Sequence, residues 1–275
     1  MIIDGKAEAQ KLKEEIKQEV LEKELKLKLV VVIVGDDPAS QIYVRNKKLA
    51  CESVGIQSEI VALESSTTQN VLNETLDKLS SDPSVNGILL QLPLPKHLNE
   101  EQALSHINCL KDVDGLSVSN AGKLFLNQTM IAPCTPLGIL HLIKSVNPNL
   151  QGLNAVVVGR SALVGKPTAQ LLLNENCTVT ICHSKTKNLK KFTLLADILV
   201  VAIGKPKFIT GDYIKKDAIV IDVGINRVDG KIVGDVEFES ASKIASHITP
   251  VPKGVGPMTV AMLLKNLLNL YKLQN

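Results

Sequence analysis

A turn with two glycines separates an apolar segment from a helix-forming segment near the middle of the chain. The apolar segment, residues 155–158, is mostly β-branched and leads directly into Gly159, and Gly165 follows six residues later. A strand, a glycine turn and a helix in this order are typical of a βαβ unit that binds the phosphates of a dinucleotide. Ser161 stands where the usual G-x-G-x-x-G fingerprint has its second glycine, and Pro167 excludes a magnesium-binding P-loop. Taken alone, the turn is equally consistent with a structural corner.

The loop after the next predicted strand has the charge expected for binding a phosphorylated ribose. The strand covers residues 178–182, and no acid follows it where an NAD site would bind the ribose 2′-hydroxyl. A basic loop, residues 183–187, stands there instead. Ser184 supplies a hydroxyl in this loop, and Arg160 in the glycine turn adds a permanently charged donor. The combination favours NADP over NAD, with a solvated basic loop as the structural alternative.

Four polar residues in the first half of the chain suit proton transfer or substrate binding. Tyr43 and Lys47 lie four residues apart, which places them on one face of a helix. Gln91 ends an apolar segment, and its amide can both donate and accept hydrogen bonds. Asp114 precedes Gly115 in an acidic, turn-forming segment. Each also has an ordinary structural interpretation: a surface pair, a polar strand end or a solvated turn.

A stiff loop, residues 249–259, precedes the last predicted helix. It contains three prolines and two glycines. Such a loop holds its backbone in a fixed shape, and its glycines allow backbone N–H groups to come close to a ligand. The loop is therefore a further candidate for ligand binding.

Helices and strands are predicted to alternate along the chain. In the first half we expect helices over 6–26, 38–54 and 71–79, strands over 29–34, 60–63 and 87–92, and a short helix capped by Asn99. In the second half we expect helices over 137–146, 168–173 and 258–273, and strands over 155–158, 178–182, 198–202 and 218–223. This pattern predicts an α/β fold with parallel sheets, in which loops after the strands bind ligands.

The composition excludes several classes of protein. The chain has 275 residues, of which 45% are hydrophobic and 21% charged, so it can bury a core and is not disordered. A net charge of +3, with 3% aromatic residues and no Trp, argues against nucleic-acid binding. The five cysteines form no C-x-x-C pair, so we expect buried, reduced thiols and no metal site. No signal peptide or membrane span is recognisable, so we expect a cytoplasmic protein that does not bind membranes.

Eight segments of the chain match the motifs of one enzyme family, in the family's order. They are YVRNK (43–47), GILLQLPLP (87–95), KDVDG (111–115), PCTPLG (133–138), GRSALVG (159–165), VIDVGINR (220–227), GDVE (234–237) and TPVPKGVGPMT (249–259). On these motifs the chain resembles bifunctional methylenetetrahydrofolate dehydrogenase/methenyltetrahydrofolate cyclohydrolase over essentially its whole length.

The resemblance implies a two-lobed α/β enzyme with two activities. Residues 1–137, together with the C-terminal helix in 255–275, would form a folate-binding lobe with a parallel sheet, and residues 138–254 would form an NADP-binding Rossmann lobe. The first reaction would oxidise 5,10-methylenetetrahydrofolate by hydride transfer to NADP. The second would hydrolyse the 5,10-methenyl product to 10-formyltetrahydrofolate. The family also implies a homodimer.

The resemblance also assigns roles to individual residues. Lys47 is the expected catalytic residue of the hydrolysis step, and Tyr43 is expected beside it against the folate. Gln91 is expected to contact and tune Lys47, and Asp114 to bind the pterin ring. The other expected ligand-binding residues are Gly256 and Pro257 for folate, and Gly159, Arg160, Ser161, Ser184 and Ile225 for the cofactor.

Two positions depart from the family's pattern. Lys253 replaces the first glycine of a Pro-Gly-Gly-Val-Gly-Pro loop, and Ser184 stands where some members carry arginine. Two alternatives stay open. One is another NADP-dependent dehydrogenase of similar architecture, acting on an amino acid or a shikimate-type acid. The other is a non-catalytic nucleotide-binding regulator. Folate binding and turnover distinguish them.

Overall fold

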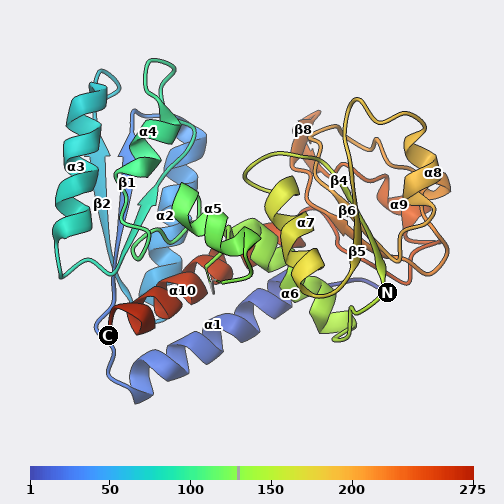
Figure 1. The fold of residues 1–275 in the computed structure, drawn as a ribbon, viewed down its shortest axis with the longest axis horizontal. Coiled ribbons are helices and arrows are strands. Elements are labelled where there is room, and N and C mark those ends of the chain that lie inside the picture. Colours follow the sequence, from blue (N-terminus) through green and yellow to red (C-terminus); the bar gives the residue numbers. More distant parts are fainter. Residues whose placement is uncertain (129–130) are drawn as a thin grey trace. The chain divides into compact units, whose positions relative to one another are not determined.

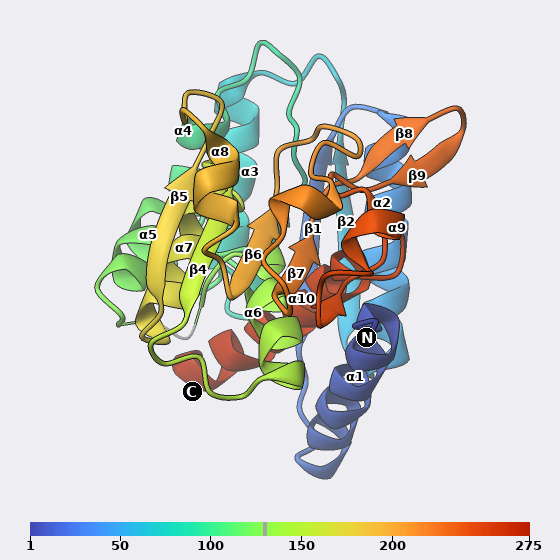
Figure 2. The same ribbon diagram turned by 90° about the vertical axis from the view of Figure 1, so that its right-hand side faces the viewer.

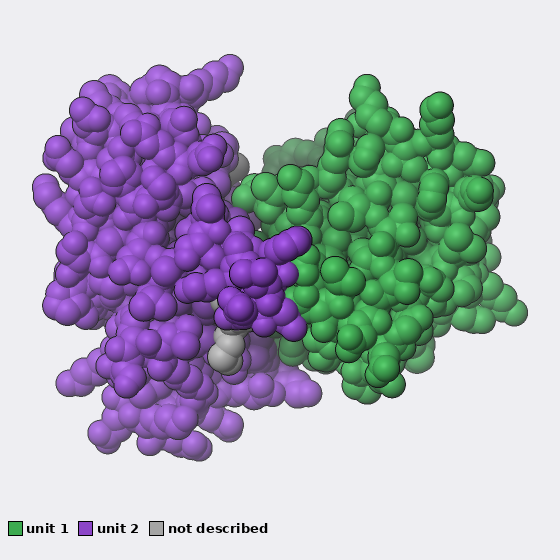
Figure 3. Space-filling view, viewed as in Figure 1, with its two compact units in different colours: residues 1–10, 133–262 green, residues 11–132, 263–275 purple. Residues whose placement is uncertain are grey.

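The computed structural model describes residues 1–128 and 131–275, and the chain divides into two units (Figures 1 and 3). Unit 1 consists of residues 1–10 and 133–262, and unit 2 of residues 11–132 and 263–275. Two helices, α1 (Gly5–Glu22) and α10 (Val255–Gln274), each begin in unit 1 and end in unit 2. The lobe boundaries predicted at 137/138 and 254/255 stay a prediction.

Unit 2 contains a three-stranded parallel sheet in the order β2-β1-β3. The central strand, β1 (Lys28–Val34), is buried from its second residue onward, because both neighbouring strands and the covering helices exclude water from it. It is flanked by β2 (Gln57–Leu63) and β3 (Gly87–Leu90). All three strands were predicted, although β2 begins three residues earlier and β3 ends two residues earlier than expected. Their carboxyl ends therefore meet at one edge of the sheet.

The helices of unit 2 begin at recognisable capping residues. They are α2 (Pro38–Ser53), α3 (Gln69–Ser81), α4 (Glu100–Ser105) and α5 (Val118–Phe125) (Figure 1). Asp37 caps α2 by accepting a hydrogen bond from the Ser40 amide, and Pro38 occupies the first helical position. Asn99 caps α4 through the Gln102 amide, as its spacing predicted. The short helix α5 was not predicted.

Unit 1 contains a five-stranded parallel sheet in the order β10-β7-β6-β4-β5 (Figure 2). Its strands are β4 (Asn154–Val158), β5 (Thr178–Cys182), β6 (Ile198–Val201), β7 (Ile219–Asp222) and β10 (His247–Ile248). The order reverses beside β4, because β5 lies on one side of it and β6 on the other. Open α/β sheets bind ligands at such a point, beyond the carboxyl ends of the strands.

Helices and a hairpin surround the sheet of unit 1. They are α6 (Cys134–Val146), α7 (Gly165–Asn174), α8 (Leu189–Thr193), the short helix η1 (Gly211–Tyr213), α9 (Phe238–Ala241) and the antiparallel pair β8 (Asn226–Val228) and β9 (Lys231–Val233). Apolar residues from β4, β6 and β7 form the buried core beneath them. The hairpin, η1, α8 and α9 were not predicted, because each is too short to show a periodicity.

The second half of α10 packs within unit 2. Asn266 is fully buried, and its Nδ2 donates to the carbonyl oxygens of Val113 and Ala132, both at 2.9 Å. Near the end of the helix, Lys272 Nζ lies 2.7 Å from Glu19 Oε1 of α1. The predicted return of the C-terminal helix to the first lobe is confirmed by these contacts.

Four of the five cysteines are buried, as predicted, whereas Cys109 is only half-buried. Burial raises the pKa of the Cys51 thiol to about 12, so this side chain behaves as a small apolar group. Among the described residues, no helix is both long enough and apolar enough to cross a membrane.

Candidate active site

Lys47 and Gln91 meet at the carboxyl edge of the unit 2 sheet. Lys47 lies on α2, and Gln91 directly follows β3. Lys47 Nζ donates a hydrogen bond to Gln91 Oε1 at 2.9 Å, and Gln91 Nε2 donates to the carbonyl oxygen of Leu92 at 2.6 Å. The second bond holds the amide group so that its acceptor oxygen faces the lysine. Gln91 is only 9% exposed and Lys47 is half-buried, so the structure brings these two predicted residues together in a partly buried contact.

Tyr43 lies one turn before Lys47 on α2. The adjoining face of this helix is buried, since Val44 is 1% exposed and Cys51, one turn after Lys47, is fully buried. Tyr43 is 50% exposed, and Lys47 is half-buried. The predicted i, i+4 pair therefore lies at the border between the buried and the exposed face of α2, with Lys47 on the buried side.

The motif at residues 111–115 is built into unit 2 by buried hydrogen bonds, and it is not a solvated turn. Lys111 is 8% exposed, and its Nζ donates to the carbonyl oxygen of Asp82 at 2.6 Å, where α3 ends. Burial lowers the pKa of this lysine. Asp112 is 2% exposed and accepts hydrogen bonds from the Ser117 amide at 2.8 Å and from Asn120 Nδ2 at 3.0 Å. The motif thus joins the end of α3 to the start of α5.

Asp114 lies between positions that the fold fixes on both sides. Asp112 is anchored as described, and Gly115 adopts a φ of +64°. A Cβ atom at Gly115 would lie 2.7 Å from the carbonyl carbon of Ala132, so only glycine fits this close approach. The side chain of Asp114 is half-buried. The backbone on either side therefore holds this carboxylate in a defined place.

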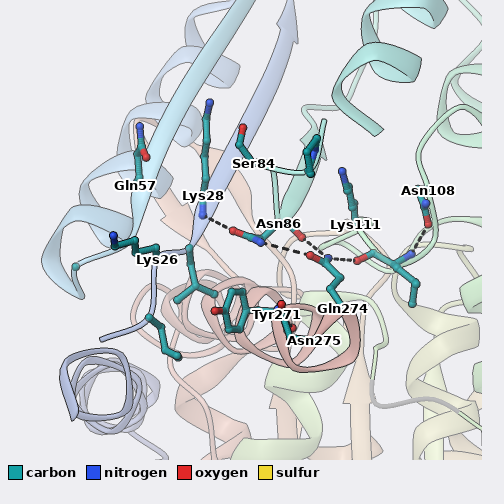
Figure 4. Close-up of a pocket in the computed structure, with 15 residues that line it drawn as sticks. Lys26, Lys28, Gln57, Ser84, Asn86, Asn108, Lys111, Tyr271, Gln274 and Asn275 are labelled. Carbon is teal, nitrogen blue, oxygen red and sulfur yellow. Dashed lines mark hydrogen bonds between the residues drawn. The ribbon is translucent and has the colours of Figure 1, made fainter. Parts of the chain in front are cut away.

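A pocket of about 900 Å³ opens at the amino ends of the same strands, the end opposite to Gln91 (Figure 4). Its polar side chains are engaged with one another and with the backbone: Asn86 Oδ1 accepts from the Lys28 amide at 2.8 Å, and Gln274 Nε2 donates to the Asn86 carbonyl oxygen at 2.8 Å. Lys28 Nζ also pairs with Glu59 at 2.8 Å. These contacts attach the end of α10 to the sheet, so the pocket is a structural junction and not the candidate active site.

The glycine turn of unit 1 connects β4 to α7 by close backbone contacts. Gly159 has a φ of +137°, and a Cβ atom there would overlap the carbonyl oxygen of Ala202 after β6. A Cβ atom at Gly165 would overlap the carbonyl oxygen of Gly159. The two glycines therefore bring the start of α7 close to the ends of β4 and β6. A strand, a tight glycine turn and a helix in this arrangement are typical of a dinucleotide-binding βαβ unit.

Ser161 and Arg160 supply the polar groups of this turn. Ser161 Oγ accepts hydrogen bonds from the amides of Val164 and Gly165, at 3.2 and 3.3 Å, where α7 begins. The hydroxyl oxygen thus accepts the hydrogen bonds that these N–H groups would otherwise donate to an anion. Arg160 is exposed beside it. Both predicted residues lie at the carboxyl end of β4.

The basic loop after β5 lies next to the glycine turn. β4 and β5 pair with Val158 opposite Cys182, and the Gly159 amide donates to the Cys182 carbonyl oxygen at 2.8 Å. Ser184 and Arg160 each stand two residues after this pair of strand ends, and both are exposed. The structure therefore brings the predicted hydroxyl and the predicted guanidinium to neighbouring loops.

The remaining predicted ligand-binding residues occupy two other places in unit 1. Ile225 follows β7 and is 59% exposed. Gly256 and Pro257 were predicted in a loop, but they lie in the first turn of α10, which begins at Val255. A proline is tolerated there because the first amides of a helix have no partner within the helix. Lys253, the departure from the family's glycine, has a φ of +84°, a conformation that favours glycine.

Two buried carboxylates of unit 1, Asp222 and Asp235, were not predicted as site residues. Asp222 ends the apolar strand β7, and both residues lie in family motifs, at 220–227 and 234–237, to which no site role was assigned. Within the part of the chain that the structure describes, no group of three metal-ligating side chains occurs.

Comparison with known proteins assigns the family. The model of the tetrahydrofolate dehydrogenase/cyclohydrolase catalytic domain matches residues 3–114, and the model of the NAD(P)-binding domain of the same family matches residues 133–275. A bifunctional protein FolD of Bacillus cytotoxicus is 51% identical over 97% of this chain and 94% of its own length.

Two solved structures are similar over nearly the whole chain. The bifunctional dehydrogenase/cyclohydrolase FolD of Campylobacter jejuni has a TM-score of 0.97 and 47% identity, covering 100% of this chain and 99% of its own. The Trypanosoma brucei methylenetetrahydrofolate dehydrogenase-cyclohydrolase, complexed with NADP cofactor and inhibitor, has a TM-score of 0.93 and 38% identity, covering 99% and 97%.

The chain therefore belongs to the tetrahydrofolate dehydrogenase/cyclohydrolase family. It has both domains of the family, a catalytic domain and an NAD(P)-binding domain, and is an enzyme with both activities. The predicted family, the predicted two-lobed α/β fold and the predicted bifunctional activity are confirmed.

Proposed function

We propose that this chain oxidises 5,10-methylenetetrahydrofolate with NADP and hydrolyses the 5,10-methenyl product to 10-formyltetrahydrofolate, with Lys47 as the catalytic residue of the second step. The contact between Lys47 Nζ and Gln91 Oε1, at 2.9 Å, carries the assignment of this residue. It positions a titratable amine at the carboxyl edge of the unit 2 sheet, where ligands bind in α/β folds.

The oxidation step depends mainly on positioning. NADP, when bound, accepts a hydride from the methylene carbon, and the cation left behind is stabilised by resonance, so little acid or base catalysis is required. Gly159 and Ser161 of the glycine turn are the residues of this chain that would bind the pyrophosphate. Arg160 and Ser184 would bind the 2′-phosphate, and Ile225 would line the cofactor site.

The hydrolysis step requires proton transfer. Water forms a bond to the methenyl carbon and loses a proton. The bond from that carbon to N5 of the folate then breaks while N5 gains a proton, and the new hydroxyl group loses its proton as the formyl C=O forms. One proton is released overall. Lys47 in its neutral form accepts the proton from water and returns one to N5, and Gln91 holds its amine in place. Asp114 would hydrogen-bond the pterin ring, and Tyr43, Gly256 and Pro257 would contact the folate.

We further propose that the protein is a cytoplasmic homodimer whose ligands are folates and NADP, and not nucleic acids or membranes. The resemblance to the family suggests the dimer. The edge of the unit 1 sheet supports it, since β5 is the last strand of that sheet and its Ile181 is 43% exposed. An exposed apolar edge strand is suited to association with a second copy. The cysteines, mostly buried thiols, suit a reducing compartment.

Replacing Lys47 by methionine tests the catalytic assignment. Methionine keeps much of the apolar length of the side chain but removes the amine. We expect hydrolysis of methenyltetrahydrofolate to slow by about 100-fold or more, the usual scale for loss of an acid–base group. Oxidation should continue at a reduced rate, so that methenyltetrahydrofolate accumulates. Following the absorbance of NADPH and of methenyltetrahydrofolate together measures both steps.

Two further variants sharpen this experiment. Lys48→Met removes a neighbouring amine that pairs with Glu52 instead, at 4.0 Å, and should leave hydrolysis near the parent rate. Gln91→Ala removes the residue that holds Lys47 and should weaken the hydrolysis step. If Lys47→Met hydrolyses methenyltetrahydrofolate at the parent rate, the catalytic assignment of Lys47 is wrong, and Tyr43 and Lys47 are an ordinary surface pair.

A further inference from the structure

The carboxylate of Asp235 is completely buried and receives four hydrogen bonds from N–H groups. Oδ2 accepts from the amides of Ile203 and Gly204, at 2.7 and 2.9 Å. Oδ1 accepts from the Lys205 amide at 2.8 Å and from Asn226 Nδ2 at 2.8 Å. Among the described residues, no lysine or arginine forms an ion pair with it. Four N–H donors therefore stabilise this buried charge in place of a counter-ion.

These four donors belong to two loops at the ligand-binding edge of unit 1. Residues 203–205 follow β6. Asn226 is the first residue of β8, at the end of the short loop after β7, the strand that pairs with β6 in parallel. The loop after β6 begins at Ala202, whose carbonyl oxygen is the atom that a Cβ at Gly159 would overlap. Asp235 thus fixes the segment against which the phosphate-binding turn packs, and joins it to the loop that contains Ile225.

A second buried carboxylate holds Asp235 in place. Asp222 is 4% exposed, and its oxygens accept hydrogen bonds from the amides of Asp235 and Val236, both at 2.9 Å, and of Gly224 at 3.0 Å. A Cβ atom at Gly224 would overlap the Asp235 carboxylate, and one at Gly234 would overlap that of Asp222. Both glycines are required so that the carboxylates can approach the backbone. The Gly-Asp-Val motif at 234–236 therefore holds the backbone of the neighbouring loops in place.

The arrangement requires an acceptor at both oxygens of residue 235. A carboxylate accepts hydrogen bonds at both oxygens, whereas the amide of asparagine would direct an NH₂ group at one pair of these N–H donors. Such a change keeps the size of the side chain and breaks at least one of the two loop attachments.

We propose that Asp235 is a positioning residue for the dinucleotide: its carboxylate holds the loops after β6 and β7 in the arrangement that receives NADP. This role rests on the proposed function. It acts through the backbone of residues 203–205 and through Asn226, and it makes no contact with the reacting atoms. Hydrolysis of methenyltetrahydrofolate, which uses Lys47 and Gln91 of unit 2, does not depend on it.

The test compares Asp235→Asn with the parent protein and with Asp229→Asn, a matched change at an exposed turn between β8 and β9. Titration calorimetry at about pH 8 measures NADP binding. Burial raises the pKa of Asp222 to about 6, so this side chain is ionised at that pH. We expect the dissociation constant of Asp235→Asn to rise about 10-fold or more, since small displacements of positioning groups have effects of this size. Hydrolysis of methenyltetrahydrofolate without NADP should stay within about twofold of the parent. Asp229→Asn should match the parent in both measurements.

Hydrogen exchange gives a reading that loss of stability alone would not produce. In Asp235→Asn the amides of residues 203–205 should lose protection while those of β4 and β6 keep it. If Asp235→Asn does not accumulate as folded protein, Asn226→Ala removes one of the four donors and should raise the NADP dissociation constant several-fold. Unchanged NADP binding, or an equal loss of NADP binding and hydrolysis, would overturn the proposal. The parent protein is measured in the same series. If the parent neither binds NADP nor hydrolyses methenyltetrahydrofolate, the proposed function is wrong, whatever the result for Asp235→Asn.

Discussion

Arg160 and Ser184 act at the scale of single side chains, and the strand register explains why they can act together. Val158 and Cys182 are paired across β4 and β5, so the residues two positions beyond them are in adjacent loops. A guanidinium offers several donors in a fixed plane, and a hydroxyl adds one more. An NAD site has an acid at this place, which would repel a phosphate. The local chemistry therefore favours the 2′-phosphate of NADP.

Replacing Arg160 by alanine should raise the KM for NADP and leave the KM for NAD nearly unchanged. A charge-assisted hydrogen bond contributes about 1.5–3 kcal/mol, which corresponds to a change of roughly 10- to 150-fold. Steady-state dehydrogenase assays with both cofactors measure this. Lys187→Ala, in the same basic loop, is the matched control and should have a smaller effect. A parent protein whose kcat/KM for NAD equals that for NADP would contradict the assignment.

At the scale of elements, Glu19 joins α1 to α10 within unit 2. Its Oε1 lies 2.7 Å from Lys23 Nζ, one turn further along α1, and 2.7 Å from Lys272 Nζ on α10. The hydrogen bonds from Lys23 and from Lys272 lower the pKa of Glu19 to about 2, from an ordinary value of 4.5. One carboxylate shared between two ammonium groups is a small network, and networks contribute more to stability than isolated surface pairs.

Replacing Glu19 by glutamine should lower the free energy of unfolding by about 1 kcal/mol at neutral pH. This figure is discounted for solvent screening, because the side chain is 21% exposed. Since the pKa is depressed in the folded state, the stabilisation is complete above pH 4.5 and is lost as the pH falls toward 2. Urea unfolding of parent and variant across this range measures the difference. Glu15→Gln, at an exposed position of α1, is the control; a constant difference at every pH would refute the linkage.

At the scale of the whole molecule, the open edge of the unit 1 sheet predicts self-association. Sedimentation at micromolar concentration should show a species of twice the chain mass of 29.7 kDa. Ile181→Lys places a charge on β5 and should shift the population toward the single chain, because charged residues on an edge strand oppose pairing. Only the single-chain species in the parent protein would rule out the homodimer.

The sequence by itself determined most of the elements and the chemistry of this protein. Fully buried strands such as β1 appear as continuous apolar runs, and helix starts such as Asn99 carry their own capping residues, so both signals are local. The Gly159 turn and the basic loop predicted a phosphorylated dinucleotide from residue types alone. The eight ordered motifs then indicated the family.

The tertiary structure decided how these residues meet, including the Lys47–Gln91 contact that the resemblance had implied. Lys47 and Gln91 are 44 positions apart, and the parallel arrangement of the sheet brings them to 2.9 Å. Asp112 resembled part of a solvated turn but is buried by hydrogen bonds to α5. Asp235 lies in the family motif at 234–237, but no local signal showed its role, because its hydrogen-bond donors come from residues 203–205 and Asn226. A buried charge is recognisable only when its donors are known, and those donors come from distant segments that strand register and packing bring together.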